Sequence, residues 1–168
     1  MNNRIILGAA ICIVDPVDKA VLLFRRTDGQ GWCCSGGKVE EGEHPLEAAL
    51  REFNEETGIP LYSFKRDVYD KEFDKFPVFS SFIRKKTGEK LYSASHIFVF
   101  KRRRAELEKF LGDIDCGDLE TGDGELDRFA WVDKVLLENE FIEKLFAPTE
   151  KVLNRLFDLT DDAVCITR

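Results

Sequence analysis

The chain has 168 residues, of which 43% are hydrophobic and 34% are charged. This composition is typical of a globular protein and excludes a disordered or fibrous chain, and the length suits a single domain over residues 1–168. With 25 Lys and Arg against 32 Asp and Glu, the net charge is -7. That balance argues against a DNA-binding protein or a polybasic membrane binder, because both need an excess of cations.

Two neighbouring strands are predicted at the start of the chain. Residues 5–14 and 20–24 are rich in Ile, Val and Leu, and a short turn-like segment separates them. The first run is too short to cross a bilayer as a helix, and no small-residue cleavage site follows it. We therefore interpret it as a buried strand. Four glycines between residues 29 and 37 then indicate a loop.

The most regular pattern in the chain predicts a helix after this loop. Pro45 suits the first helical position, and Gly58 suits the position just beyond the last turn. The apolar residues that recur at helical spacing, and that we expect on the buried face, are Leu46, Ala49, Leu50 and Phe53.

Strands and helices alternate in the remainder. Residues 62–103 have a β-like pattern with a turn at 87–90, and the acidic, glycine-bearing residues 112–127 indicate a loop. The last expected elements are a short strand at 129–132 and two amphipathic helices at 135–146 and 149–159, separated by Pro148. This order predicts an α/β or α+β fold with a mixed sheet between helices.

The five cysteines do not form a recognisable framework. Their number is odd, no Cys-x-x-Cys spacing occurs, and the only close pair, Cys33 and Cys34, is adjacent. This pattern predicts reduced thiols in a cytoplasmic protein.

Three carboxylates on the predicted helix point to metal chemistry. Glu52, Glu55 and Glu56 have spacings of three and four residues, so they share one helix face. Like charges on one face repel unless cations neutralise them, and Mg²⁺ prefers carboxylate oxygens. Arg51 lies four residues after Glu47 and four before Glu55, where it can bridge both. The alternative is a solvated acidic face without a ligand.

The order of residues around this helix resembles the signature of the Nudix hydrolase family, the MutT-like pyrophosphohydrolases. Gly37 is followed after five residues by Glu43 and after seven more by Arg51-Glu52-Phe53-Asn54-Glu55-Glu56-Thr57-Gly58-Ile59. Phe53 stands where an aliphatic residue is usual, and Ser35 stands where many members have proline. The signature covers residues 37–59, and a looser resemblance covers roughly residues 6–159.

The resemblance implies a fold, a reaction and a set of site residues. The fold would be an α/β/α sandwich with a mixed sheet. The reaction would be Mg²⁺- or Mn²⁺-dependent hydrolysis of a nucleoside diphosphate linked to another group. Metal-binding positions of the family match Glu52, Glu55 and Glu56, and Gly37 matches a glycine whose carbonyl can join them. The family's supporting positions, including an ion pair that orients the carboxylates, match Gly36, Glu43, Arg51 and Gly58.

A further acid and two arginines complete the expected site. Family members use as general base either a glutamate of the signature or one on a later loop. We favour Glu125, six residues before Trp131, as an outlying metal ligand or base, with Glu52 as the competitor. Arg25 and Arg26 end a predicted strand before the glycines and can contact substrate phosphates. Because neighbouring strand residues alternate in direction, at most one of them can face the site.

Three functions are consistent with the sequence. The first is hydrolysis of a small nucleotide: a nucleoside polyphosphate, a dinucleoside polyphosphate or a nucleotide sugar. The second is hydrolysis of capped or 5′-phosphorylated RNA ends, suggested by basic runs at 84–86 and 101–104. The third is a non-catalytic nucleotide-binding regulatory module. The acidic excess is concentrated in residues 37–59 and 112–127, so bound cations there would attract a polyphosphate.

Overall fold

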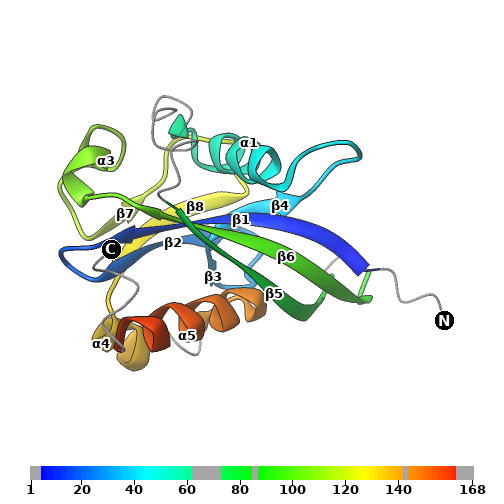
Figure 1. The fold of residues 1–168 in the computed structure, drawn as a ribbon. Helices are drawn as coiled ribbons and strands as arrows, with labels where there is room; N and C mark the ends of the chain where they lie inside the picture. Colours follow the sequence, from blue (N-terminus) through cyan, green and yellow to red (C-terminus); the bar gives the residue numbers. More distant parts are fainter. Residues whose placement is uncertain (1–4, 62–72, 85–86, 142–143, 162–168) are drawn as a thin grey trace.

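The computed structural model describes residues 5–61, 73–84, 87–141 and 144–161, and it contains one mixed sheet between two layers of helices (Figure 1). The strands are β1 (Ile5–Asp15), β2 (Ala20–Arg26), β3 (Trp32–Cys33), β4 (Ser35–Lys38), β5 (Phe73–Ile83), β6 (Lys90–Lys101), β7 (Cys116–Asp118) and β8 (Leu126–Val132). The helices are α1 (Pro45–Thr57), α3 (Arg104–Leu111), α4 (Lys134–Leu136), the π-helical turn η2 (Leu137–Phe141) and α5 (Ala147–Asp161).

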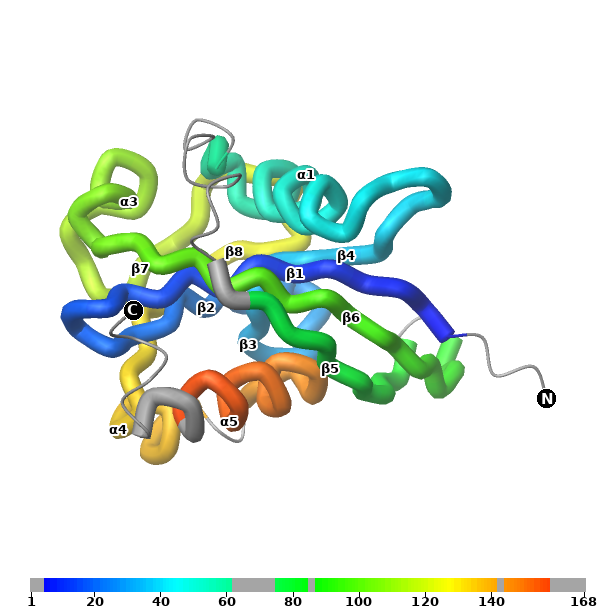
Figure 2. Tube along the Cα trace, viewed as in Figure 1, coloured from blue at the N-terminus to red at the C-terminus, as the bar shows by residue number. Residues whose placement is uncertain are grey.

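The long strand β1 organises the sheet. The main order is β5-β6-β1-β2-β8-β7, with β3 beside β2 and β4 beside β1. β1 is parallel to β6, whereas it is antiparallel to β4 through residues 8–11 and to β2 through residues 13–15. The chain therefore returns to β1 through β4, and the following connection loops outward before it enters α1 (Figure 2).

Alternating residues of the strands fill two separate cores. In β1, Ile11 and Ile13 belong to the core under α1, while Cys12 and Val14 belong to the core that includes residues of α5. This alternation follows from the pleat of a strand, whose successive side chains point to opposite faces. α1 lies above the sheet and α5 below it (Figure 1). The predicted α/β/α sandwich with a mixed sheet is confirmed.

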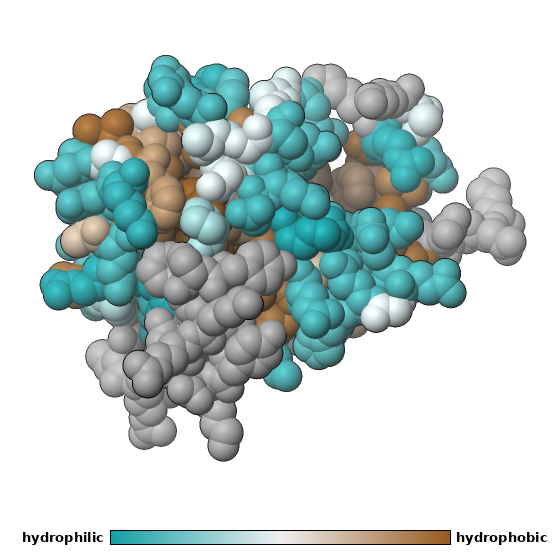
Figure 3. All heavy atoms as spheres, turned by 90° about the horizontal axis from the view of Figure 1, so that it is seen from above, coloured by the Kyte–Doolittle hydropathy of each residue, from teal (hydrophilic) through white to brown (hydrophobic). Residues whose placement is uncertain are grey.

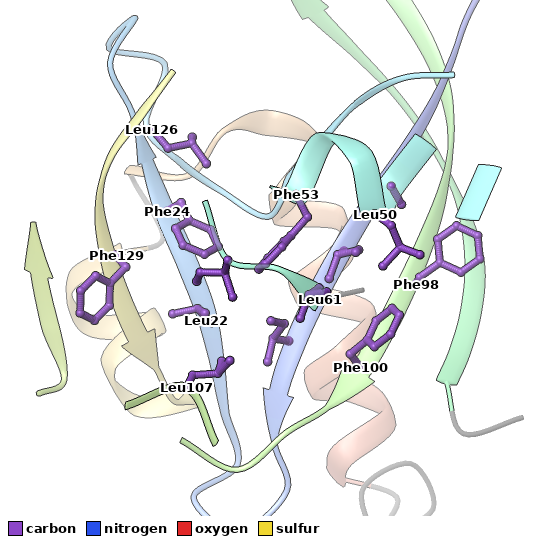
Figure 4. Packing of buried hydrophobic residues seen from close by; sticks show 14 of the residues in the cluster. Leu22, Phe24, Leu50, Phe53, Leu61, Phe98, Phe100, Leu107, Leu126 and Phe129 are labelled. Atoms are coloured by element: carbon purple, nitrogen blue, oxygen red, sulfur yellow. The ribbon is translucent and has the colours of Figure 1, made fainter. Parts of the chain in front are cut away.

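Phe53 links α1 to the sheet. Its side chain is 0% exposed, and its ring meets that of Phe24 on β2 edge-on, with the centroids 5.9 Å apart. Figure 4 shows both rings among the apolar side chains of the surrounding strands. An aromatic ring thus fits the place where the family usually has an aliphatic residue. Seen from the side of α1 and α3, most of the described surface is hydrophilic (Figure 3).

The predicted helix at 45–57 is confirmed with its boundaries. His44 Nδ1 accepts a hydrogen bond from the backbone N–H of Leu46, and the Glu47 carboxylate accepts one from the backbone N–H of His44. This reciprocal pair satisfies two of the donors that a helix start leaves open. Gly58 ends the helix with φ of 69°, a left-handed conformation that glycine adopts without strain.

Several other expectations need correction. The glycine-rich segment 29–37 is not all loop, because Gly36 and Gly37 pair with β1 in β4, where the backbones approach closely. The acidic segment 112–127 contains β7 and the start of β8. Helix α3 was not predicted, since its eight residues bury only Leu107 and Leu111.

The C-terminal helices also differ from expectation. Residues 135–146 are not one helix but the short α4 followed by η2. Pro148 does not separate two helices; it lies in the first turn of α5, where its missing N–H is tolerated. The strands around the predicted turn at 87–90 are confirmed as β5 and β6, and residues 62–72 lie outside the described ranges.

Two further observations bear on the environment of the protein. Within the described ranges, no helix is long and apolar enough to cross a membrane. Cys12, Cys33 and Cys34 are buried free thiols, Cys116 is an exposed one, and Cys165 lies outside the described residues.

Replacing Phe53 with alanine tests its role as the link between α1 and the sheet. We expect Phe53→Ala to lower the free energy of unfolding by about 3–5 kcal/mol, because the cavity forms in a packed core. The matched control is Phe79→Ala, whose side chain is 68% exposed and which should change stability by no more than about 0.5 kcal/mol. Urea denaturation of both variants makes the comparison, and equal losses would contradict this account of the core.

Candidate active site

The carboxylate of Glu52 lies directly against β4. A Cβ atom added at Gly37 would be 2.3 Å from Glu52 Cδ, so any side chain there would displace the carboxylate. Burial raises the pKa of Glu52, hydrogen bonding and the charge of Arg51 lower it, and the charges of Glu55 and Glu125 raise it further. The absence of a side chain at Gly37 therefore leaves the space in which this carboxylate lies against the strand.

Glu56 is the most deeply buried acid of the cluster, with 4% of its surface exposed. Its Oε2 accepts hydrogen bonds from Ser35 Oγ at 2.6 Å and from the backbone N–H of Gly36 at 3.0 Å. Burial raises its pKa to about 7 despite these two bonds, and the charges of Glu52 and Glu125 raise it further. A buried carboxylate among like charges is costly unless a cation compensates it.

Arg51 connects the loop before α1 to the carboxylate cluster. Its Nε and Nη2 donate to both oxygens of Glu43, at 2.9 and 3.1 Å. Its Nη1 donates to Glu52 at 2.8 Å and to Glu55 at 3.2 Å. The bond to Arg51 lowers the pKa of Glu43. The ion pair with Glu43 agrees with the resemblance, whereas the bridge to Glu47 expected from spacing is wrong, because Glu47 caps the helix.

A loop after β7 carries Glu125 to the cluster. The backbone N–H of Asp123 donates to Glu55 O at 2.8 Å, and Thr121 Oγ donates to Thr57 O. Gly122 adopts φ of 95°, and its Cα faces the end of α1 so closely that an added Cβ would be 2.1 Å from Glu56 O. These contacts attach residues 121–123 to the C-terminal end of α1, and only Gly124 separates them from Glu125.

One partly open pocket of about 430 Å³ brings most of the expected residues together. The expected residues that line it are Arg26, Gly36, Gly37, Glu52, Glu56 and Glu125. The Glu55 side chain is 51% exposed and lies outside the lining, as does Arg25, whose guanidinium pairs with Asp127 at 2.7 Å. Only one of the two arginines faces the pocket, as their alternation along the strand predicts.

The donor set has the chemistry that a hard divalent cation needs. Glu52, Glu56 and Glu125 offer only oxygen ligands. Burial and, to a smaller extent, the charges of neighbouring acids raise the pKa of Glu52 and of Glu56. In the described part of the chain, no group of three or more such side chains is already arranged to hold a metal ion. In this structure Glu52 accepts a hydrogen bond from Arg51, and Glu56 accepts one from Ser35. Metal ligation by these residues stays a prediction.

Several residues of the pocket region were not found by sequence reasoning. Ser35 anchors Glu56, although its position before the glycines marked only a departure from the family pattern. Thr121 and Asp123 hold the loop of Glu125, and turn-rich composition was the only signal for them. Phe82 and Phe146 line the far end of the pocket, and nothing in the local sequence distinguishes them from core residues.

Known proteins resemble this chain in sequence and in fold. A NUDIX domain model matches residues 6–147. The m7GpppN-mRNA hydrolase NUDT17 of Xenopus laevis is 45% identical over 60 residues, which cover 33% of this chain and only 20% of that relative's length.

Two solved structures illustrate the likeness of the fold. MutT protein from Methanosarcina mazei Go1 has a TM-score of 0.59 and 19% identity, covering 95% of this chain and 98% of its own. A bifunctional NMN adenylyltransferase/ADP ribose pyrophosphatase from Francisella tularensis, in complex with AMP and an Mn ion, has a TM-score of 0.59 and 16% identity. That match covers 93% of this chain and 42% of the other.

Two glycines of the Glu125 loop provide a matched test of its attachment to α1. Gly122 and Gly124 both have positive φ, of 95° and 87°, but an added Cβ at Gly124 would meet nothing within 4 Å. We expect Gly124→Ala to cost about 1–2 kcal/mol of stability from backbone strain alone. Gly122→Ala should cost roughly 1–3 kcal/mol more, because its Cβ overlaps the α1 backbone. Thermal unfolding measures both, and equal losses would show that the loop is not attached as described.

Proposed function

The chain belongs to the Nudix family of hydrolases, which act on pyrophosphate bonds in nucleoside diphosphate derivatives, and we propose that its substrate is a small nucleotide. The candidates are a nucleoside polyphosphate, a dinucleoside polyphosphate and a nucleotide sugar. One observation carries this proposal: Glu52, Glu56 and Glu125 line a pocket of about 430 Å³, within the range of small-molecule sites.

We propose Mg²⁺ or Mn²⁺ as the cofactor, held by Glu52, Glu55, Glu56, Glu125 and the carbonyl oxygen of Gly37. When bound, such an ion neutralises phosphate charge and lowers the pKa of coordinated water. The Mn ion named for the Francisella structure supports this choice. The chain covers 42% of that protein, so its full activity does not transfer to this chain.

The protein's own residues have distinct proposed roles. Arg51 orients Glu52 and Glu55 through its fork, with Glu43 holding the guanidinium from the other side. Ser35 and Gly36 fix Glu56. Arg26 faces the pocket and can contact a substrate phosphate, since guanidinium groups bind phosphate oxygens well.

We favour Glu125 as the base that accepts a proton from the attacking water. Glu56 is hydrogen-bonded to Ser35 and Gly36, and Glu52 to Arg51, whereas Glu125 is exposed, lines the pocket and lies on its own loop. An exposed carboxylate can pass its proton to solvent after each turnover. Glu52 remains the competing candidate.

A set of single substitutions tests these roles. With Mn²⁺ or Mg²⁺ and a panel of small nucleotides, we expect Glu56→Gln and Glu125→Gln each to lower kcat by at least about 100-fold. The matched control is Glu120→Gln, an exposed acid of the same loop segment outside the pocket lining, which should keep wild-type activity. A Glu125→Gln variant that keeps the wild-type kcat at saturating metal would exclude Glu125 as the base and leave Glu52.

Hydrolysis of capped RNA is the second candidate, and the name of the Xenopus relative favours it. The basic run at 101–104 gives it little support. Arg102 is buried, and Arg104 pairs with Asp18 and Asp115 beyond the end of β6, outside the pocket lining. Including a capped RNA in the same panel, with identification of the products, separates the two candidates.

The third candidate function is a non-catalytic nucleotide-binding regulatory module. Nucleotide binding without release of any product from the whole panel, in wild type and Glu56→Gln alike, would favour this reading and contradict the hydrolase proposal.

The single-domain organisation and the cytoplasmic location are also proposals. α5 extends beyond the matched residues 6–147, and its Val152 and Leu153 pack into the same core as β1 and β6, which supports one domain over residues 1–168. The free thiols of Cys12, Cys33 and Cys34 are consistent with the reducing cytoplasm.

A further inference from the structure

The pocket continues well beyond the carboxylates. Its lining also includes the apolar side chains of Ile6, Val78, Phe82, Ile97, Phe146 and Val152, and we call the part formed by Phe82 and Phe146 the apolar end. The residues come from β1, β5, β6 and α5 and from the segment before α5. Cleavage of a pyrophosphate needs none of them, so this end is available to recognise the rest of the substrate.

Two aromatic rings dominate the apolar end. The rings of Phe82 and Phe146 have centroids 5.6 Å apart and planes at 62°. Both side chains are only partly buried, whereas Phe24, Phe53 and Phe129 of the core are at most 1% exposed. The two pocket rings therefore keep surface for a ligand.

Arg26 connects this aromatic end to the carboxylates. Its guanidinium lies over the Phe146 ring, 4.8 Å from the centroid, and donates to both oxygens of Asp28. Burial lowers the pKa of Arg26, but the hydrogen bond to Asp28 and the charges around it raise that pKa above its usual value. Glu56 is near enough for its charge to be one of them. The order along the pocket is thus carboxylates, then Arg26, then the aromatic rings.

Residues 145–151, which carry Phe146 and which we call the wall of the pocket, are attached to the sheet. The backbone N–H of Phe146 donates to Trp32 O at 2.8 Å, and Trp32 forms a parallel bridge with Leu145. Gly31 allows this approach, because an added Cβ would be 2.2 Å from Lys144 O. A ring held in this way is preorganised, which lowers the entropic cost of binding.

The same wall is attached to the sheet at two more points. The backbone N–H of Cys34 donates to Thr149 Oγ at 3.3 Å, and Lys151 Nζ donates to Phe79 O at 2.7 Å. The wall therefore contacts β5 as well as the segment between β3 and β4. These contacts fix the segment that carries Phe146 relative to β5, the strand that carries Phe82.

We propose that Phe82 and Phe146 hold the nucleobase of the substrate by stacking, and that they make the site selective for nucleotides over phosphate esters without a base. This inference rests on the proposed function, since it places the phosphates at the carboxylate end. Every base offers a flat π-face, so stacking tolerates different bases. The pair therefore recognises the presence of a base more than its identity.

Binding of reaction-product analogues tests the proposal without turnover. Calorimetry would measure the Kd of adenosine 5′-monophosphate, uridine 5′-monophosphate and ribose 5-phosphate for wild type, Phe82→Leu and Phe146→Leu. Leucine keeps apolar volume but removes the π-face. We expect each variant to bind both nucleotides about tenfold more weakly, with ribose 5-phosphate unchanged. Phe82→Tyr, which keeps the ring, should bind both nucleotides as tightly as the wild type does.

Phe79→Leu is the matched control, because Phe79 is exposed on the same strand and outside the pocket lining, and it should bind as wild type does. Equal affinity of the wild type for the nucleotides and for ribose 5-phosphate would overturn the proposal, and this comparison needs no variant. Wild-type affinity in both leucine variants would also overturn it. Failure of hydrolysis in the substrate panel would instead contradict the proposed function, so the two failures are distinguishable.

Discussion

The candidate site depends most on the ion pairs that Arg51 forms with the acids around it. Several acids, some in the pocket lining and some beside it, must stay close together although their charges repel. One guanidinium contacts three of them, Glu43, Glu52 and Glu55, and thereby joins the loop before α1 to the helix. A lysine would keep the charge but lose the fork that reaches several carboxylates at once.

The rest of the structure supplies the surroundings that make this cluster useful. Phe53 fixes α1 on the sheet, β4 brings Gly36 and Gly37 against Glu56 and Glu52, and the loop at 121–123 attaches Glu125 to the end of the helix. Burial leaves Glu56 with a pKa of about 7, so neighbouring cations would determine its charge near neutral pH. The burial of apolar side chains in the two cores stabilises this arrangement.

The sequence predicts what local patterns and fixed spacing can encode. It predicts α1 with both ends, the strands β1 and β2, a mixed sheet between helices and the group of acids on α1, while the family resemblance implies the α/β/α sandwich. It does not predict contacts between distant segments, such as Ser35 with Glu56 or Phe146 with Arg26, because no spacing relates residues that only the fold brings together. The partner of Arg51 shows the same limit: helical spacing suggests Glu47, but a loop residue, Glu43, occupies its fork.

Direct titration with Mn²⁺ tests the central claim, which is that the carboxylates of this pocket form a site for a divalent ion. Calorimetry of the wild type should show saturable binding, and Glu56→Gln should bind at least about tenfold more weakly while unfolding at a similar temperature. Saturable binding that is the same in wild type and Glu56→Gln, or no binding in wild type, would contradict the account.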